Sequence, residues 1–507
     1  MTVGIAWEQL CSQAGEDSLR RLINETPENF YGDVARRNLH WFDESADQGG
    51  SFDLASQQWV GYAAYSGESV TSTKADDKNL WKQVLDESQS PYLRWFVGAN
   101  TNACFNLLDR HILQGQGHNK ALIFEGDRWD PAKNAGRGGP VTEQHFTYRQ
   151  LLLEVTLRAR VLNNLGLRTG DRIALNMPNI PEQIFYILAA QRLGILYTPV
   201  FGGFSAKTLS DRLHDAGAKL VITADGGFRN AEAVAFKSQY TDPALDNYVP
   251  REAGLKALED TLNNYPGIEE RDHIIATVTG AVASEITLER ADIMRELGAA
   301  LSTCTGLNPE VSAKLRTQVA IALAGVGHTI DKVMVARYTG QEVIEHDRDV
   351  YSDDLVAQAA SDCLQDLGIA DFDSLNGLED QQYWSIINGL QSVVPVEANW
   401  PLFIIYTSGS TGKPKGVVHT HGAWLAGVTH SMHSVFNATP DDTLYVVGDP
   451  GWITGQSYLI AAPLSMGMTR LSAKDHPYSL TRVALHLPSS DMVSPFSKRA
   501  PPSSRQS

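Results

Sequence analysis

Cysteine is scarce in this chain, which has four among its 507 residues and no pair of them at metal-ligand spacing. This usage excludes a disulfide scaffold and a cysteine-based zinc site, and it predicts reduced thiols in a cytoplasmic protein. No apolar run is long enough to span a bilayer, so the sequence predicts no transmembrane helix. The first twenty residues carry three acidic side chains and no long apolar core, so no signal peptide is expected.

Positive charge is also in short supply, because 42 Lys and Arg face 59 Asp and Glu, a formal net charge of −17. This balance excludes a general nucleic-acid surface or anionic-membrane surface, since both require an excess of cations. An anionic small molecule would have to be held by local lysines and backbone amides. The length allows two or three domains with ample core.

One segment does have the composition of an anion-binding loop. The apolar run from Phe403 to Tyr406 leads directly into residues 407–416, which contain three glycines, four hydroxyl side chains and two lysines. The run predicts a buried strand, and its glycines would let backbone N–H groups approach an oxyanion. The pattern is not a Walker A motif, because its glycines are too close together and Pro414, rather than Ser or Thr, follows Lys413. A flexible surface turn is the alternative.

The run Tyr406–Gly416, Y-T-S-G-S-T-G-K-P-K-G, resembles the signature loop of the adenylate-forming (ANL) acyl-CoA synthetases. The resemblance implies that ATP and CoA are substrates and that Mg²⁺ accompanies ATP. It also implies that Thr407 and Lys413 act in catalysis, with Lys415 as a supporting charge. The residues implied to bind the ATP phosphates are Thr407, Ser408, Gly409, Ser410, Thr411, Gly412 and Lys413.

Residues 121–224 alternate short apolar runs with amphipathic segments. Strands are expected at 121–125, 171–176, 195–200 and 219–224, and helices at 148–165, 182–193 and from Ser205 through Ala216. Thr147 and Gln150 have capping-box spacing. This order predicts an α/β fold in which helices cover a parallel sheet. The resemblance implies the parallel-sheet-containing N-terminal part of an acyl-CoA synthetase/luciferase-like fold, with a helical insert.

Residues 449–458, D-P-G-W-I-T-G-Q-S-Y, are similar to a run of the acetyl-CoA synthetases. That similarity implies a substrate pocket formed by Trp452, Ile453 and Thr454, with Thr454 also contacting CoA or another ligand. Gln456 stands where the related run usually has histidine. Residues 93–111 resemble the segment that precedes the first core strand of the same enzymes.

Residues 225–229 resemble a segment in which a pair of arginines contacts the CoA phosphates. Arg229 holds the first position of that pair, but Glu232 stands at the second. A solvated arginine in a turn is therefore an equal alternative for Arg229. Three histidines, His111, His419 and His421, are expected to be structural rather than functional.

The long stretch from 230 to 400 predicts an added helical segment. Asn308-Pro309-Glu310 has the order of an N-cap, an N1 proline and a first-turn acid, and 281–301 also has helical character. We expect a structural or interdomain role for it. The predicted divisions are an acetyl-CoA-synthetase-like segment (1–120), the first part of an AMP-binding core (121–229), the connection with its insert (230–400), the core with the signature loop (401–468) and a tail (469–507).

The tail from residue 469 onward lacks clear periodicity and is rich in Ser and Pro. If the reading frame is shifted by one nucleotide, the codons for the residues from Leu480 onward can encode a turn, an amphipathic helix and an apolar strand. We therefore expect a frameshifted tail, with the adenine- and ribose-binding motifs and a C-terminal domain missing. The absence of such a continuation in the coding DNA would refute this expectation.

Taken together, these motifs predict an AMP-forming short-chain acyl-CoA synthetase acting on acetate, propionate or 3-hydroxypropionate. The sequence also resembles the ligase portion of the propionyl-CoA synthases, which are multidomain fusions. The first alternative is a non-catalytic nucleotide-binding remnant of such an enzyme. The second is a fragment completed by a separate C-terminal partner. Neither nucleic acid nor membrane is an expected partner.

Overall fold

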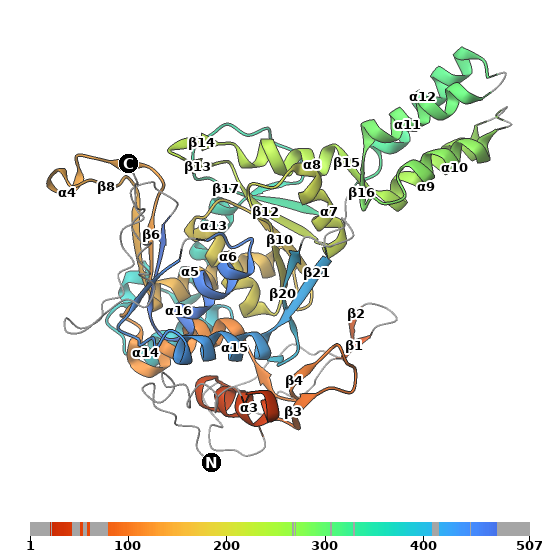
Figure 1. Ribbon diagram of the computed structural model, residues 1–507. Coiled ribbons are helices and arrows are strands. Elements are labelled where there is room, and N and C mark those ends of the chain that lie inside the picture. The colour runs from red at the N-terminus through yellow and green to blue at the C-terminus, as the bar shows by residue number, and fades with distance from the viewer. Residues whose placement is uncertain are drawn as a thin grey trace, which may run out of the picture.

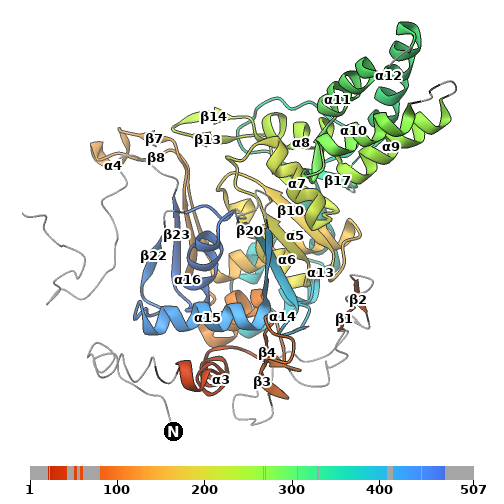
Figure 2. The same cartoon turned by 45° about the vertical axis from the view of Figure 1, so that its right-hand side comes forward.

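The computed structural model describes residues 21, 23–42, 51–53, 58–60, 80–265, 268, 270–304, 307–327, 330–407, 415–446 and 448–473. These residues form a body of two sheets and their covering helices, from which a helical arm projects (Figures 1 and 2). Within this described part of the chain, no helix is both long enough and apolar enough to cross a bilayer.

A seven-stranded sheet forms the centre of the body. Its strand order is β18-β17-β12-β10-β11-β20-β21, and every neighbouring pair is parallel except β20 and β21. The strands are β10 (Arg172–Asn176), β11 (Leu196–Pro199), β12 (Leu220–Ala224), β17 (Lys332–Ala336), β18 (Asp349–Tyr351), β20 (Pro401–Thr407) and β21 (Lys415–Thr420). The predicted parallel sheet is confirmed.

Helices cover both faces of this sheet. Along β12 the side chains of Leu220, Ile222 and Ala224 join the main core, whereas Val221 joins a smaller core on the other face. The main core is shared with α5 (Tyr148–Asn164), α6 (Pro181–Leu193), α13 (Ser352–Leu367) and α14 (Asp380–Leu390). The smaller core is shared with α7 (Ala206–Ala216) and α8 (Asp242–Asp246). This alternation is the period of two expected for strands covered on both faces.

The helix ends follow the local signals in the sequence. Thr147 and Gln150 form the predicted capping box of α5, and the Ser205 side chain accepts a hydrogen bond from the Thr208 amide at the start of α7. Gly194 and Gly217 end α6 and α7 in the left-handed conformation, with φ of 65° and 58°.

A four-stranded sheet lies beside the main one, with the order β22-β23-β6-β9. Its strands are β22 (Thr443–Tyr445), β23 (Thr469–Ala473), β6 (Lys120–Glu125) and β9 (Glu143–Thr147). The strand β23 pairs in parallel with both β22 and β6. The first five residues of the predicted tail, 469–473, therefore form a regular strand that pairs with two segments distant in the sequence. The rest of the predicted tail, 474–507, lies outside the described residues.

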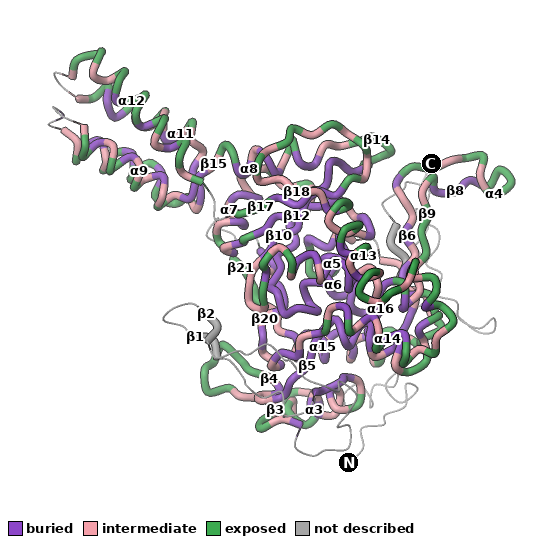
Figure 3. Tube along the Cα trace, turned by 180° about the vertical axis from the view of Figure 1, so that it is seen from behind, coloured by how far each residue is buried: buried purple, intermediate pink, exposed green. Residues whose placement is uncertain are grey.

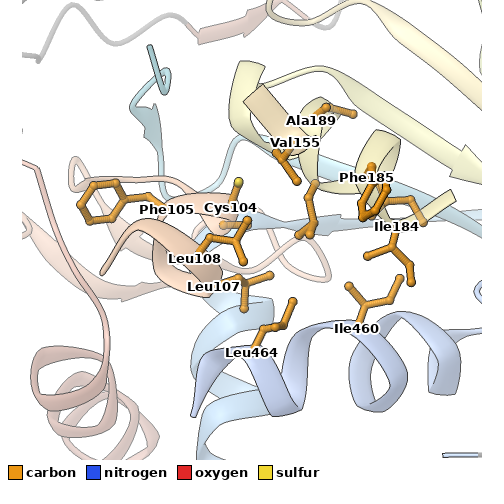
Figure 4. Packing of buried hydrophobic residues seen from close by; sticks show 14 of the residues in the cluster. Cys104, Phe105, Leu107, Leu108, Val155, Ile184, Phe185, Ala189, Ile460 and Leu464 are labelled. Atoms are coloured by element: carbon orange, nitrogen blue, oxygen red, sulfur yellow. The ribbon is translucent and has the colours of Figure 1, made fainter. Parts of the chain in front are cut away.

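The core between the two sheets brings together segments distant in sequence. Figure 4 shows Cys104, Phe105, Leu107 and Leu108 near Val155, Phe185, Ile460 and Leu464, all in the main core. Buried positions concentrate in this region, whereas the outer turns are exposed (Figure 3). The guanidinium of Arg192 pairs with the Asp109 carboxylate at 2.9 Å, and both side chains are fully buried. The indole N–H of Trp384 also donates a hydrogen bond to Asp109, and this bond helps to stabilise the buried carboxylate.

The N-terminal segment lies below the body in the view of Figure 1. It contains α3 (Pro27–Asn38), β1 (Ser51–Asp53), β2 (Gln58–Val60), β3 (Gln83–Asp86), β4 (Arg94–Val97) and β5 (Asn100–Thr101). The side chain of Asn399 links this segment to the later chain, because it accepts a hydrogen bond from the Trp95 amide and donates one to the Trp95 carbonyl. The strand β5 also pairs with β19 (Val396–Glu397).

Four helices form the projecting arm: α9 (Arg251–Asn264), α10 (Arg271–Ala281), α11 (Arg290–Thr303) and α12 (Pro309–Ala324) (Figure 1). They enclose a hydrophobic core of their own, which includes Leu258, Leu297 and Leu315. The predicted helical insert is therefore present, and Asn308 caps α12 as expected. Residues 281–301 are not continuously helical, because β16 (Thr287–Glu289) interrupts them and pairs with β15 (Tyr248–Pro250).

The helices α15 (His421–Ser434) and α16 (Ala462–Ser465) contribute buried residues to the main core. The other short elements include α4 (Lys133–Gly136), the β7–β8 pair (Trp129–Asp130 and Gly139–Pro140) and the β13–β14 hairpin (Gly227–Arg229 and Glu232–Val234).

Candidate active site

A cavity of about 350 Å³ lies where the carboxyl ends of the central parallel strands meet. The turns after β10, β11 and β12 all contribute to its wall, as does the segment after β22. Its lining includes Asp127, Asn179, Phe201, Arg229, Asp449 and Trp452. In an open parallel sheet, ligands bind outside the carboxyl ends of the strands where the strand order reverses. The cavity has this position, because β11 and β12 flank β10 on opposite sides.

Arg229 reaches the cavity from a hairpin rather than from the predicted turn. It ends β13, and Glu232 is its direct partner on β14. The turn between them places Asn230 and Ala231 at positive φ, and the Asp127 carboxylate accepts the Ala231 amide at 2.8 Å. Glu232, which occupies the position expected for the second arginine, therefore lies opposite Arg229 across the hairpin. Arg229 itself is exposed at the cavity wall.

The adjoining Asp225 was not singled out from the sequence, yet it organises this region. Its buried carboxylate accepts the backbone amides of Tyr338 and Gly340 at 2.8 and 2.7 Å. These bonds tie the end of β12 to the loop after β17. The two segments come together only because β12 pairs with β17, so this contact could not be predicted from spacing along the sequence.

The segment 449–458 forms the opposite side of the cavity. Trp452 lines it; the residue is 48% exposed, and its ring centroid lies 5.9 and 5.8 Å from those of Phe201 and Phe204. Ile453 is 40% exposed and Thr454 is also exposed, and neither lines the cavity. The structure thus brings Trp452 and Arg229 to one cavity and places Ile453 and Thr454 beside it.

Buried hydrogen bonds hold the segment 449–458 in place. The Tyr197 hydroxyl donates to the Gln456 side-chain oxygen at 2.8 Å, and the Gln456 amide group donates to the Pro450 carbonyl at 2.6 Å. Gln191 in turn donates to the Tyr197 hydroxyl at 2.9 Å. Burial raises the pKa of Tyr197, so its hydroxyl remains a neutral donor. Gln456 therefore supports the turn that carries Trp452.

Close backbone packing adds a second restraint on this turn. A Cβ on Gly451 would stand 2.5 Å from the Phe201 backbone nitrogen, which no side chain can tolerate without a shift. A glycine is needed here because the turn after β22 passes against the turn after β11. The Asp449 carboxylate accepts the Gly451 amide at 2.7 Å.

Thr407 ends β20 at the same edge of the sheet and is exposed. Lys415 begins β21 directly opposite Thr407 in the antiparallel register, and it is exposed as well. The segment predicted to bind phosphate is therefore the connection between these two strands. Its residues 408–414, including the predicted Ser408, Gly409, Ser410, Thr411, Gly412 and Lys413, lie outside the described residues.

The three histidines contribute packing. Burial lowers the pKa of His111 and of His421 to about 3, so both rings are neutral near pH 7. The Nδ1 atom of His421 accepts the Ala103 amide at 3.0 Å. The His419 ring stacks on Phe403 with 4.7 Å between centroids. These contacts agree with the expected structural roles.

Taken as a surface, the cavity combines aromatic walls with one guanidinium and two carboxylates. The aromatic rings suit an apolar or extended ligand portion, and Arg229 offers a partner for an anionic group.

Comparison with known proteins places these features in a family context. The family described as AMP-binding enzyme matches residues 121–276 and 313–486, and the acetyl-coenzyme A synthetase N-terminus matches residues 73–107. The gap at 277–312 coincides with much of the arm, and the second match continues past residue 469.

Curated relatives are similar over most of this chain. The acetyl-coenzyme A synthetase of Streptomyces avermitilis is 29% identical over 430 residues, which cover 82% of this chain and 48% of that protein. Those of Mycolicibacterium smegmatis and Methylobacterium radiotolerans are 30% and 31% identical, over 78% and 76% of this chain and 30% and 41% of their own lengths. The chain spans about half or less of the length of these relatives.

Proposed function

Because the chain belongs to the AMP-binding enzyme family, we propose that it carries out AMP-forming activation of a short-chain carboxylate for transfer to coenzyme A. The observation that carries the proposal is the common location of two features. The segment with the signature sequence leaves β20 at the carboxyl edge of the sheet, where the turns after β10, β11 and β12 line the cavity.

In the proposed first step, a carboxylate oxygen attacks the α-phosphorus of ATP. The bond from that phosphorus to the bridging oxygen breaks, and pyrophosphate leaves with the electron pair. The Mg²⁺ ion enters with the nucleotide as part of the substrate. Thr407 and Lys413, with the hydroxyls and backbone amides of 408–412, are proposed to neutralise the charge that grows on the pyrophosphate.

In the second step, the CoA thiolate attacks the acyl carbonyl carbon and AMP leaves, so that a thioester forms. Arg229 at the cavity wall is proposed to contact a CoA phosphate, and Thr454 to contact CoA or the acyl group. The aromatic face of Trp452 would wall the site. We expect this phosphate contact to be weaker than in the enzymes with an arginine pair, because here Arg229 is the single arginine of the pair and Glu232 lies opposite it.

The acid itself is proposed to be acetate, propionate or 3-hydroxypropionate. Ile453 stands at the position that the resemblance assigns to a small acyl pocket. Activation of 3-hydroxypropionate would agree with the resemblance to the ligase portion of the propionyl-CoA synthases. The similarity to acetyl-coenzyme A synthetases favours acetate as the first acid to test.

Pyrophosphate release from MgATP tests the proposal, with each of the three acids supplied in turn. We expect acid-dependent release by the wild-type chain and a loss of about 100-fold or more in Lys413→Ala. Lys415→Ala serves as the matched control and should retain most of the rate. Binding of MgATP without acid-dependent pyrophosphate release would instead support a non-catalytic nucleotide-binding protein.

A further inference from the structure

A buried arginine lies between two aromatic rings at the base of the 407–415 connection. Arg212 comes from α7 and is only 6% exposed. Its Cζ atom lies 4.1 Å from the ring centroid of Phe204 and 5.4 Å from that of Tyr406. Tyr406 immediately precedes Thr407, so Arg212 contacts the last residue before the predicted catalytic segment.

The same helix holds Tyr406 by a second contact. The Tyr406 hydroxyl donates to the Asp215 carboxylate at 2.7 Å. Asp215 follows Arg212 by three residues and therefore faces the same side of α7. The ring and the hydroxyl of Tyr406 are thus both fixed against one helix, which leaves its backbone little freedom at the point where β20 ends.

The contacts continue in the other direction to the cavity. Phe204 lies 5.8 Å from the Trp452 ring, and Trp452 lines the cavity that also contains Arg229. Trp452, Phe204, Arg212 and Tyr406 therefore form a continuous series of ring and cation–π contacts, here called the arginine link. It connects the cavity wall to the start of the connection between β20 and β21.

Packing alone does not account for a cation at this position. Across the described ranges, no carboxylate lies within ion-pair distance of Arg212, and its buried Nε atom has no hydrogen-bond partner. Asp215 accepts from Tyr406, and Asp211 accepts from Lys207 and Thr287. Burying a guanidinium without a carboxylate is costly, whereas an apolar side chain would fill the space at no such cost.

The planar guanidinium offers what an apolar side chain lacks, because it stacks on aromatic faces from both sides. Burial lowers the pKa of Arg212 to about 10, so the group remains cationic near neutral pH. Its charge and its flat shape both act on Phe204 and Tyr406.

We propose that Arg212 is a positioning residue: its stacking between Phe204 and Tyr406 holds the start of the nucleotide-binding segment in a fixed place relative to the cavity wall formed by Trp452. The inference rests on the proposed function, since it assigns the two ends of the link to the nucleotide and to the acyl or CoA group. A displacement of about 1 Å between such groups is enough to reduce turnover by roughly 100-fold.

Two substitutions separate stacking from charge. Arg212→Met keeps much of the volume but loses both the plane and the charge, whereas Arg212→Lys keeps the charge and loses the plane. If positioning by stacking is correct, both variants lose kcat by roughly 10- to 100-fold, and Lys gives little rescue. Full rescue by Arg212→Lys would overturn the proposal in favour of a charge that acts directly on the nucleotide.

The matched control is Arg158→Met. Arg158 is also a buried helical arginine, 8% exposed, with its Cζ atom 4.9 Å from the Phe185 ring, but it lies in the core away from the cavity. Steady-state kinetics of all three variants would be measured as kcat and as KM for MgATP and for the acid. Equal kinetic effects of Arg212→Met and Arg158→Met would overturn the positioning role.

Hydrogen–deuterium exchange without any nucleotide provides a readout that is independent of activity. We expect faster exchange of the β20 amides near Tyr406 in Arg212→Met and unchanged exchange there in Arg158→Met. Unchanged exchange in both variants would overturn the arginine link. An inactive wild-type chain in which exchange still separates the two variants would refute the ligase proposal and support the link.

Discussion

At the scale of single residues, the structure explains why several polar side chains near the site are buried. Gln456 uses both ends of its amide, one for Tyr197 and one for Pro450, and so supports the turn with Trp452. The sequence identified Gln456 only as a departure from an expected histidine. It could not show the partners, because Tyr197 lies on β11, more than 250 residues earlier in the chain.

His421 gives a residue-scale prediction on pH dependence. Its pKa of about 3 in the folded chain lies below the ordinary value of 6.5, so between these values the unfolded chain binds a proton that the folded chain does not. Its contribution to stability is therefore lost as the pH falls from about 6.5 toward 3, by up to about 1.4 kcal/mol per pH unit. Urea unfolding at pH 7 and pH 5 measures this slope.

In that experiment, His421→Asn should reduce the slope, because the amide oxygen can still accept the Ala103 amide but does not titrate. His145→Asn is the control, since His145 is exposed and pairs only with Glu143 in the part of the chain that the structure describes. An unchanged slope in His421→Asn would contradict the assignment.

At the scale of helices and strands, local signals predict most of the body. The capping box of α5, the Ser205 cap of α7 and the glycines after α6 and α7 specify helix ends within a few residues. The elements that the sequence did not predict are short strands. The hairpin at Arg229, the strand at Thr287–Glu289 and β23 are formed by pairing with other segments, which periodicity over three to five residues does not reveal.

The arm provides the element-scale prediction, because its core is separate from that of the body. Leu315 in α12 is fully buried in the arm core, so Leu315→Ala should destabilise the arm by about 2–5 kcal/mol. Hydrogen exchange should show lost protection in α9–α12 and retained protection in β10–β12.

Ile321→Ala in the same helix is the control, since Ile321 is 68% exposed and should have little effect. Loss of protection throughout the central sheet in Leu315→Ala would show that the arm and the body unfold as one unit.

At the scale of the whole molecule, the strand order decides where the candidate site forms. The sequence predicts a parallel sheet and an anion-binding segment, but it does not reveal that β20 lies beside β11. That pairing places Thr407 at the same edge as the turns after β10, β11 and β12. The cavity is therefore a property of the topology, whereas the signature run at 406–416 is a property of the sequence.

The most direct test of the proposed chemistry follows an oxygen atom. If a carboxylate oxygen of the acid attacks the α-phosphorus of ATP, turnover of ¹⁸O-labelled acetate or propionate with MgATP and CoA must leave one ¹⁸O atom in AMP. Mass spectrometry of the products should show that label in AMP and none in pyrophosphate. Label in inorganic phosphate with formation of ADP, or AMP without label, would contradict an acyl-adenylate intermediate.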